Sequence, residues 1–430
     1  MQALRTDIPS GFAALGIAPG LLEILARLAY TTPTPIQSQA IPVAIQGKDV
    51  VGIAQTGTGK TLAFGIPMIQ ELARVQGTGL ILLPTRELAL QVDEALRKLG
   101  STIGLKTAVL IGGTGFGAQE QALRRKPHIL IATPGRLVDH INQKTCTLHT
   151  VRILVIDEAD RMLDMGFAPD IERILARVPR ERQTMLFSAT MPEAIMKIAT
   201  KHMRLPIRIE IARTGTPAER ITQEMFIIRK DQKNRLLDKL LEQHTGTTLI
   251  FTRTKYGAKR LAVAIRGMGH SAAEIHSNRS LAQRKEALQG FKSGKYRILV
   301  ATDIASRGID VANISLVLNY DLPEASEDYI HRIGRTARAG AGGHAISFVT
   351  PEERGDVRAI ERLMKKNLPV SATPVLPPAR PQTHEQRFVE ERSSRRPHHS
   401  ARDWNAMRQS RGGGPRRRPQ RGGFPHRNRR

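Results

Sequence analysis

The chain has 430 residues, which exceeds the usual size of one domain and favours two or three. Apolar residues make up 40% of it, enough for buried cores, although only 4% are aromatic. The 66 lysines and arginines outnumber the 39 acidic residues and give a net charge of +27. This charge predicts attraction to a polyanion, most often nucleic acid, although a basic surface can also serve solubility alone.

Cys146 is the single cysteine, which excludes an internal disulfide and a thiolate metal cluster and suits a reducing compartment. The first ten residues lack the basic and then apolar pattern of a signal peptide. No apolar run approaches the roughly 18 residues that a membrane span needs. We therefore expect a soluble cytoplasmic protein.

Short continuous apolar runs recur through the first half of the chain. They are Val50–Ile53, Leu80–Leu83, Ile129–Ile131, Ile153–Ile156 and Met185–Phe187. Helical patterns lie between them, such as the one that begins after Thr85, a residue type that caps helices. The alternation predicts an α/β fold with a parallel sheet covered on both faces and ligands at the carboxyl ends of its strands.

The second half repeats this rhythm. Its apolar runs are Thr248–Phe251, Ile298–Val300, Leu316–Leu318 and Ala345–Val349. Two strand ends echo the first half, because 249–253 resembles 81–86 and 298–302 resembles 129–133. Convergent strand and turn sequences could also produce matches this short. Taken at face value, the echo predicts two copies of one α/β domain.

Composition divides the chain further. Residues 212–219 are small, polar and contain Pro and Gly, which is typical of a linker. Residues 367–430 hold 15 Arg, no Lys and 4 acidic residues, and so little apolar area cannot offset the entropy of ordering. We predict a first domain at 1–208, a linker at 209–220, a second domain at 221–366 and a disordered basic tail at 367–430.

The loop at residues 54–61 fits the phosphate-loop pattern, except that Ala54 replaces the usual glycine. Its glycines let backbone N–H groups converge on phosphate oxygens, Lys60 supplies a charge, and Thr61 offers a hydroxyl to Mg²⁺. A surface loop could carry the same letters, but this one follows an apolar run, as the motif requires. The predicted nucleotide-binding residues are Ala54, Gln55, Thr56, Gly57, Thr58, Gly59, Lys60 and Thr61.

Acidic residues follow the buried run 153–156. Asp157 can hold Mg²⁺ directly or through water, and Glu158 can polarise an attacking water. Acidic clusters are also common at helix starts because of the helix dipole. Far down the chain, Arg335 and Arg338 look like fingers that neutralise transition-state charge, although a basic run can also simply end a helix. Two distant segments then complete one ATPase site.

With these features the chain resembles a DEAD-box RNA helicase over roughly residues 12–350. The motifs occur in family order at 34–37, 84–89, 112–113, 133–136, 157–160, 188–190, 251–253, 301–310 and 331–338. The resemblance implies two tandem RecA-like domains with parallel sheets, ATP and Mg²⁺ as cofactors, and structured RNA bound with little sequence preference. It also implies a monomer, with ribosome-assembly or RNA-decay factors as possible partners.

Further site residues come from this resemblance. Gln37 would read adenine with Phe12 stacking nearby, and Asp303 would lie near the ribose. Ser188 and Thr190 would couple the nucleotide site to the RNA side. The RNA track would comprise Arg86, Gly113, Thr133, Arg136, Arg253, Thr302 and Arg307. Thr133 before a proline is also a good helix start, and paired glycines also make ordinary turns.

Three positions depart from the family pattern. Ala29-Tyr30 stands where Gly-Phe is usual, and Leu281 occupies a position that Gln often holds. Ala337 replaces a common Gly between the two finger arginines, which is typical of the bacterial RhlE-like branch. None of these changes removes a catalytic group.

Our main hypothesis is an ATP-dependent RNA helicase that closes its two domains on ATP and RNA, separates strands locally, and is reset by hydrolysis. The arginine-rich tail would tether RNA non-specifically. Two alternatives remain open: an ATP-gated RNA clamp or annealing chaperone, and a DNA-directed motor of the wider helicase superfamily. Stimulation of the ATPase by RNA but not by matched DNA would separate the last from the others.

Overall fold

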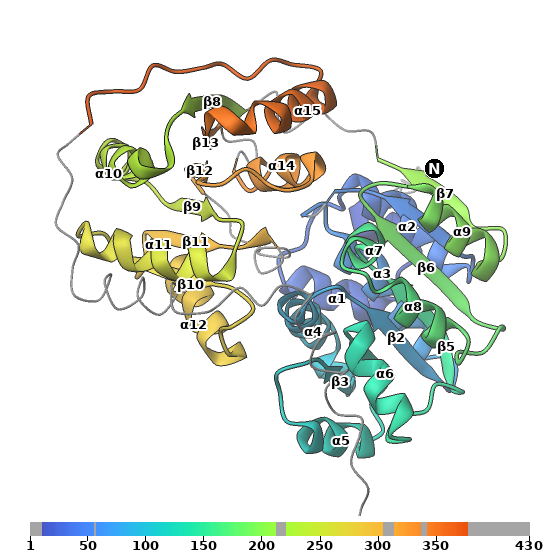
Figure 1. Ribbon diagram of the computed structural model, residues 1–430. Coiled ribbons are helices and arrows are strands. Elements are labelled where there is room, and N and C mark those ends of the chain that lie inside the picture. Colours follow the sequence, from blue (N-terminus) through green and yellow to red (C-terminus); the bar gives the residue numbers. More distant parts are fainter. Residues whose placement is uncertain (1–10, 56, 212–220, 304–313, 337–341, 377–430) are drawn as a thin grey trace, which may run out of the picture. The chain divides into compact units, whose positions relative to one another are not determined.

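The computed structural model describes residues 11–55, 57–211, 221–303, 314–336 and 342–376, which form two parallel sheets flanked by helices (Figure 1). The first sheet has seven strands in the order β3-β4-β2-β5-β6-β1-β7. Its strands are β1 (Val50–Ile53), β2 (Thr78–Leu82), β3 (Thr107–Leu110), β4 (Ile129–Ala132), β5 (Val151–Ile156), β6 (Gln183–Ser188) and β7 (Ile207–Glu210).

Helices precede and connect these strands. They are η1 (Gly11–Leu15), α1 (Pro19–Arg27), α2 (Pro35–Ile45), α3 (Lys60–Leu72), α4 (Arg86–Gly100), η2 (Ser101–Ile103), α5 (Phe116–Arg124), α6 (Pro134–Asn142), α7 (Ala159–Asp164), α8 (Ala168–Leu175) and α9 (Glu193–His202). The predicted cap of α4 is confirmed, because Thr85 Oγ1 accepts the backbone N–H of Leu88 at 3.3 Å.

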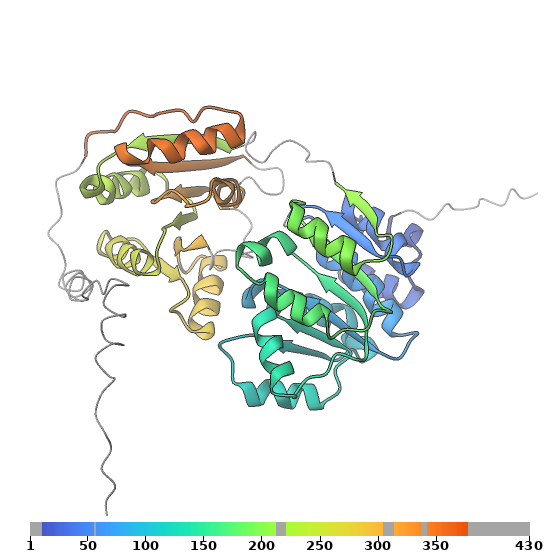
Figure 2. The same cartoon turned by 45° about the vertical axis from the view of Figure 1, so that its right-hand side comes forward.

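The continuous apolar strands of the first sheet are buried on both faces. Alternate residues of β2 serve opposite sides: Ile81 packs with α2, α3 and α4, whereas Leu80 and Leu82 pack with α6 to α9. Figure 2 shows these helices as layers on either side of the sheet. The burial explains why the strands carry uninterrupted apolar runs rather than alternating ones.

The second sheet has six strands in the order β10-β11-β9-β12-β13-β8. Its strands are β8 (Ile221–Ile227), β9 (Thr248–Phe251), β10 (Ala272–Ile275), β11 (Ile298–Ala301), β12 (Leu316–Asn319) and β13 (Gly343–Val349). The helices are η4 (Lys230–Gln232), α10 (Lys233–Gln243), α11 (Lys255–Gly267), α12 (Leu281–Lys292), α14 (Ser326–Ile333), η5 (Pro351–Glu353) and α15 (Arg354–Met364). Helices α10 and α11 pack on one face, and α12 on the other.

Apart from β7, both sheets have the same strand order. The short sequence matches between the two halves of the chain therefore reflect a repeated fold. In chain order, β1 to β6 of the first sheet correspond in position to β8 to β13 of the second, and β7 is an addition to the first sheet. Thr85 and Thr133 follow β2 and β4, and Thr252 and Thr302 follow the matching β9 and β11. The prediction of two related α/β domains with parallel sheets is confirmed.

Two predicted boundaries were wrong by a few residues. Residues 209 and 210 belong to β7 rather than to the linker, because this strand pairs in parallel with β1. Residues 367–376 pack on the second sheet rather than joining the tail. The N–H of Met225 donates to Pro369 O and the N–H of Ser371 donates to Met225 O, each at 2.8 Å, and Leu368 is 4% exposed.

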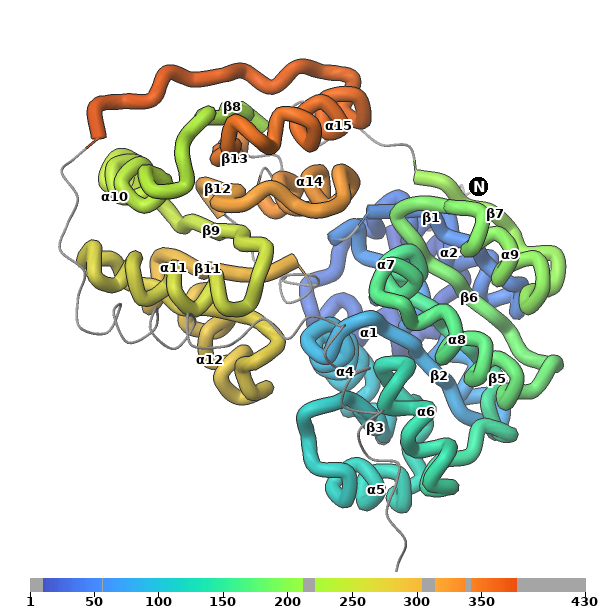
Figure 3. Tube along the Cα trace, in the orientation of Figure 1, coloured from blue at the N-terminus to red at the C-terminus, as the bar shows by residue number. Residues whose placement is uncertain are grey.

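These backbone hydrogen bonds give β8, an outer strand of its sheet, a partner on its free side. Figure 3 shows the chain after α15 running back along this side of the second sheet. The guanidinium of Arg235 on α10 donates to Leu376 O at 3.2 Å and holds the far end of this segment. The remaining residues of the predicted linker and tail, 212–220 and 377–430, lie outside the described part of the chain.

No helix in the described part of the chain is long and apolar enough to cross a membrane.

Candidate functional site

Three predicted motifs meet where neighbouring strands of the first sheet end. Strands β5, β6 and β1 lie side by side, and the acidic motif, Ser188 and the phosphate loop sit at their carboxyl ends. The N–H of Ala54 donates to Ser188 O at 3.0 Å, which joins the loop to β6. A parallel sheet therefore brings these segments together although they are far apart in the sequence.

The phosphate loop has the backbone conformation that its glycines allow. Gly57 and Gly59 have φ angles of 86° and 89°, a region that favours glycine. A Cβ at Gly59 would collide with the Gln37 side chain, while the space beside Gly57 is open. Helix α3 begins at Lys60, with half-buried Thr61 in its first turn. The loop is thus a cradle at a helix N-terminus; Thr56 lies outside the described residues.

Lys60 and Asp157 form a buried ion pair in this cradle. The Lys60 Nζ lies 3.3 Å from Asp157 Oδ1, and the two residues are 5% and 3% exposed. Within the described residues, Nζ has no acceptor at hydrogen-bonding geometry. A buried ammonium group with donors to spare fits an anionic ligand such as a phosphate.

The acidic pair is held in an unusual local structure. Burial raises the pKa of Asp157; attraction to Lys60 opposes the shift, and repulsion from Glu158 adds to it. A divalent cation would relieve this unfavourable burial of a carboxylate, so Asp157 fits a Mg²⁺ ligand. Glu158 has a φ of 53°, which non-glycine residues rarely adopt and which costs about 1–3 kcal/mol. Such strain is common at catalytic positions.

The predicted adenine-reading element is bonded to the phosphate loop. Gln37 Nε2 donates to Gly59 O at 3.0 Å, and its Oε1 accepts the N–H of Thr34 at 2.9 Å. The Thr34 hydroxyl donates to Thr58 O at 2.7 Å. Phe12 is 5% exposed and packs in the core with α2. The element therefore supports the loop, and the adenine contacts of Gln37 and Phe12 stay predictions.

Sequence reasoning missed a role for Asp160. Its Oδ2 accepts the backbone N–H groups of Ala189 and Thr190 and the Thr190 hydroxyl, at 3.0–3.1 Å. The N–H of Asp160 donates to Ser188 Oγ at 3.2 Å. Both predicted coupling residues therefore contact the acidic motif. In the sequence, this role was indicated by the position of Asp160 as the last residue of the acidic motif at 157–160.

Four residues of the predicted RNA track lie near one another in the first domain. The guanidinium of Arg86 packs against Gly112 and Gly113, where any Cβ would crowd it, and Gly113 has a φ of 80°. Arg136 Nη1 donates to Thr114 O at 3.3 Å, in the same turn. Thr133 precedes the first residue of α6, as its sequence predicted. These groups can bind a phosphate backbone.

In the second domain, Arg253 and Thr302 follow β9 and β11, two neighbouring strands. The guanidinium of Arg253 is paired with Glu353 at 3.2 Å and donates to Leu322 O at 3.3 Å. Arg335 lies just after α14. Arg307 and Arg338 lie outside the described residues.

Asp303 forms a bidentate pair with Arg332, a residue to which the sequence analysis gave no role. The two hydrogen bonds, from Arg332 Nε and Nη2, are 2.6 and 2.7 Å long. The Arg332 side chain is 1% exposed and also donates to Asn319 Oδ1 at 3.1 Å. Its place inside the 331–338 motif was the only signal in the sequence. The ribose contact of Asp303 stays a prediction.

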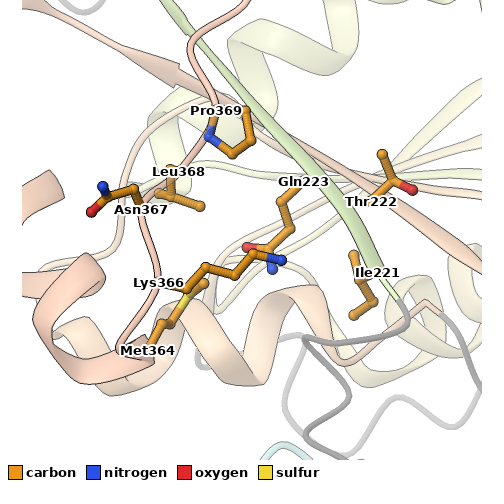
Figure 4. Close-up of a pocket in the computed structure, with 8 residues that line it drawn as sticks. All are labelled: Ile221, Thr222, Gln223, Met364, Lys366, Asn367, Leu368 and Pro369. Atoms are coloured by element: carbon orange, nitrogen blue, oxygen red, sulfur yellow. The ribbon is translucent and has the colours of Figure 1, made fainter.

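A hollow of about 300 Å³ opens elsewhere, between β8 and the segment after α15 (Figure 4). Its lining includes Ile221, Gln223 and Leu368, and none of the predicted site residues. The predicted ATP-binding and RNA-binding sites therefore do not include this hollow.

Comparisons with known proteins identify the family. The family model for the DEAD/DEAH box helicase matches residues 34–198, and that for the helicase conserved C-terminal domain matches residues 232–340. The ATP-dependent rRNA helicase RRP3 of Debaryomyces hansenii is 44% identical over 367 residues, 84% of this chain and 77% of that protein. The DEAD-box ATP-dependent RNA helicase CshA of Geobacillus kaustophilus is 43% identical over 370 residues, 85% and 79% of the two chains.

Solved structures support the fold. Dbp5 of S. cerevisiae bound to RNA and ADP BeF3 has a TM-score of 0.75 and 28% identity, covering 89% of this chain and 99% of that one. Mss116p bound to ssRNA and AMP-PNP has a TM-score of 0.75 and 30% identity, covering 83% and 78%. The tandem RecA-like architecture is confirmed. The chain belongs to the DEAD-box family of ATP-dependent RNA helicases.

Proposed function

We propose that this helicase hydrolyses ATP in the cradle of its first domain and uses hydrolysis to reset a cycle of local RNA strand separation. The observation that carries the proposal is the buried Lys60–Asp157 pair beside a glycine-lined loop. A buried lysine with unused donors is costly unless an anion completes its partners. The triphosphate of ATP supplies that anion.

The individual roles follow from the chemistry of each side chain. Lys60 binds the β- and γ-phosphates, and Glu158 orients the attacking water and accepts its proton. Thr61 and Asp157 hold Mg²⁺, partly through water; the ion supplies charge neutralisation at the phosphates when bound. Arg335 and Arg338 come from the second domain and stabilise the charge of the transition state when the domains close.

Ser188 and Thr190 link this chemistry to RNA in our proposal. They contact Asp160, which lies two residues from Glu158. A change around the acidic motif on ATP binding can therefore alter the segment after β6. Coupling of this kind lets binding of ATP and RNA favour the closed state together.

The RNA track of Arg86, Gly113, Thr133 and Arg136 in the first domain, and of Arg253, Thr302 and Arg307 in the second, would bind phosphates and 2′-hydroxyls. Guanidinium groups and backbone amides suit these partners and carry little sequence preference. Several relatives are named rRNA helicases. We therefore infer that structured ribosomal RNA is the substrate and that ribosome-assembly factors are partners. We also propose that the protein works in the cytoplasm as a monomer.

The basic tail from residue 377 onward would tether RNA. Its arginines release counterions from the RNA backbone, so its contribution should fall as salt rises. Removal of residues 377–430 should weaken RNA binding and flatten its salt dependence while basal ATPase activity stays constant. The cut must follow residue 376, because residues 369–371 pair with β8 and Leu376 O accepts from Arg235 on α10. An unchanged salt slope would contradict the tether.

ATP hydrolysis without nucleic acid, with structured RNA and with DNA of matched length tests the proposed function. We expect strong stimulation by RNA alone, because 2′-hydroxyls distinguish the two polymers. Equal stimulation by DNA would favour the DNA-directed motor. Stimulation by RNA with strand annealing but no separation would favour the ATP-gated clamp.

A further inference from the structure

A cluster of side chains lies behind the RNA-facing turn of the first domain, outside every family motif. It consists of Phe116 and Gln119 on α5 and His140 on α6. Gln119 and His140 are 4% and 0% exposed, and Phe116 is half-buried. Helix α5 begins just after the turn at 112–114, and α6 follows Thr133 and carries Arg136.

Gln119 holds both ends of the turn. Its Oε1 accepts the N–H of Ile111 at 3.1 Å, and its Nε2 donates to Ile111 O at 2.9 Å. The same Nε2 donates to Thr114 Oγ1 at 2.6 Å. The pair of backbone hydrogen bonds fixes which way the amide points. One buried side chain therefore sets the shape of the turn that contains Gly113.

His140 supports Gln119 from behind. Its Nε2 lies 3.3 Å from Gln119 Oε1, which can only accept, so Nε2 carries the proton. Its Nδ1 then accepts from the Thr145 hydroxyl at 2.8 Å. Burial lowers the pKa of His140, and the charge of Arg136 lowers it further. The ring is therefore neutral at pH 7 and satisfied at both nitrogens.

Phe116 connects this support to Arg136. Its ring stacks on His140 with centroids 4.0 Å apart and an interplanar angle of 16°. The guanidinium carbon of Arg136 lies 5.8 Å from the same ring centroid. Arg136 and His140 are one helical turn apart, which lets both reach one ring. The ring therefore restricts the position of the Arg136 guanidinium.

We propose that Phe116, Gln119 and His140 are positioning residues that hold Arg136 and the 112–114 turn ready for the RNA backbone. A preformed site binds more tightly than one that must be ordered on binding, because the ordering has been done during folding. This inference rests on the proposed RNA contact of Arg136. It predicts that the first domain binds RNA without rearranging this turn.

The Phe116→Leu variant tests the proposal in the full-length protein. We expect its dissociation constant for a single-stranded RNA oligonucleotide to rise about 3- to 10-fold. Its affinity for an ATP analogue and its RNA-free ATPase rate should not change, which also reports that the protein is folded. Phe116→Tyr keeps the ring and should restore RNA binding. Tyr296→Leu is the control, because it also removes a half-buried aromatic ring, at the amino end of β11.

A double-mutant cycle with Arg136→Ala separates positioning from general damage. If Phe116 acts through Arg136, Phe116→Leu should have no further effect on RNA affinity once Arg136 is alanine. A full loss in both backgrounds would overturn the positioning role and leave the RNA contact of Arg136 intact. Normal RNA affinity of Arg136→Ala itself would overturn that contact and this inference together.

Discussion

The carboxylate of Asp160 accepts hydrogen bonds from both the backbone N–H and the hydroxyl of Thr190, each at 3.0 Å. The same oxygen also accepts the N–H of Ala189 at 3.1 Å. The last residue of the acidic motif is therefore tied to the segment after β6, which lies next to β5 in the sheet. If the acidic motif moves, the segment after β6 must therefore move with it, or these hydrogen bonds must be distorted.

Thr190→Val should weaken the coupling of ATP hydrolysis to strand separation. It removes one of three hydrogen bonds to Asp160 Oδ2, worth about 1 kcal/mol or a factor of five, while it keeps the side-chain shape. We expect near-normal RNA-stimulated ATPase activity with several-fold fewer duplexes separated per ATP. Both rates are measured in one reaction. The control is Thr200→Val, whose exposed hydroxyl donates to Met196 O within α9; an unchanged ratio in Thr190→Val contradicts the coupling role.

Lys60→Ala should abolish tight ATP binding. Charge-assisted hydrogen bonds to the phosphates are worth about 1.5–3 kcal/mol each, so we expect a loss of at least 10- to 100-fold in affinity. The free energy of unfolding should also fall, because Asp157 is left buried without its partner. Titration with a fluorescent ATP analogue measures the affinity. Lys48→Ala, an exposed lysine just before β1, should bind ATP normally.

Glu158→Gln should bind ATP and RNA but turn over slowly. The amide keeps the size of the side chain and its strained backbone, but it cannot accept the proton of the attacking water. We expect turnover to fall about 10²- to 10⁴-fold. Single-turnover hydrolysis with bound RNA isolates this step. Turnover at the normal rate would remove Glu158 from the catalytic residues.

Glu353→Gln should increase the affinity for RNA. The carboxylate is paired with Arg253 at 3.2 Å, and RNA phosphates would compete with it for that guanidinium. Partly exposed ion pairs are worth about 0.2–1 kcal/mol, so a gain of about 1.5- to 5-fold is expected. The dissociation constant is measured at several salt concentrations. Glu352→Gln, its exposed neighbour, is the control, and weaker RNA binding by Glu353→Gln would contradict the competition.

The sequence predicted the central strands of both sheets because their residues are buried on both faces and uninterrupted in apolar character. Val50–Ile53 and Thr248–Phe251 have the predicted bounds. The four missed strands, β3, β7, β8 and β10, lie at the edges of the two sheets; β7 (Ile207–Glu210) has two charged residues, and β10 (Ala272–Ile275) contains Glu274. Glu274 is 5% exposed and paired with Arg266, which no local pattern reveals.

The site was predictable where a motif encodes its chemistry, as at Lys60 and Asp157, which the structure places 3.3 Å apart. Contacts formed by packing could not be predicted. The left-handed backbone of Glu158 depends on the turn between β5 and α7, since no glycine marks it. The Asp303–Arg332 pair joins residues 29 positions apart through the tertiary fold alone.

His140 should make the first domain less stable in acid. Its pKa in the folded protein is lowered, mainly by burial and secondly by Arg136, while Asp139 and Glu120 oppose the shift. Below the ordinary value of 6.5, the unfolded chain therefore binds a proton that the native ring resists. The stabilisation by neutral His140 is present above that pH and is lost as pH falls toward the lower folded pKa.

His140→Phe removes this proton uptake and keeps a ring against Phe116. The variant is expected to be less stable at pH 7, because Gln119 loses a donor, but its free energy of unfolding should decline less between pH 7 and 5.5. The slopes should differ by up to about 1.4 kcal/mol per pH unit, the value for one proton. Urea unfolding at several pH values measures both slopes. His149→Phe, at an exposed position, should retain the wild-type slope; if His140→Phe also retains it, folding does not lower the pKa of His140.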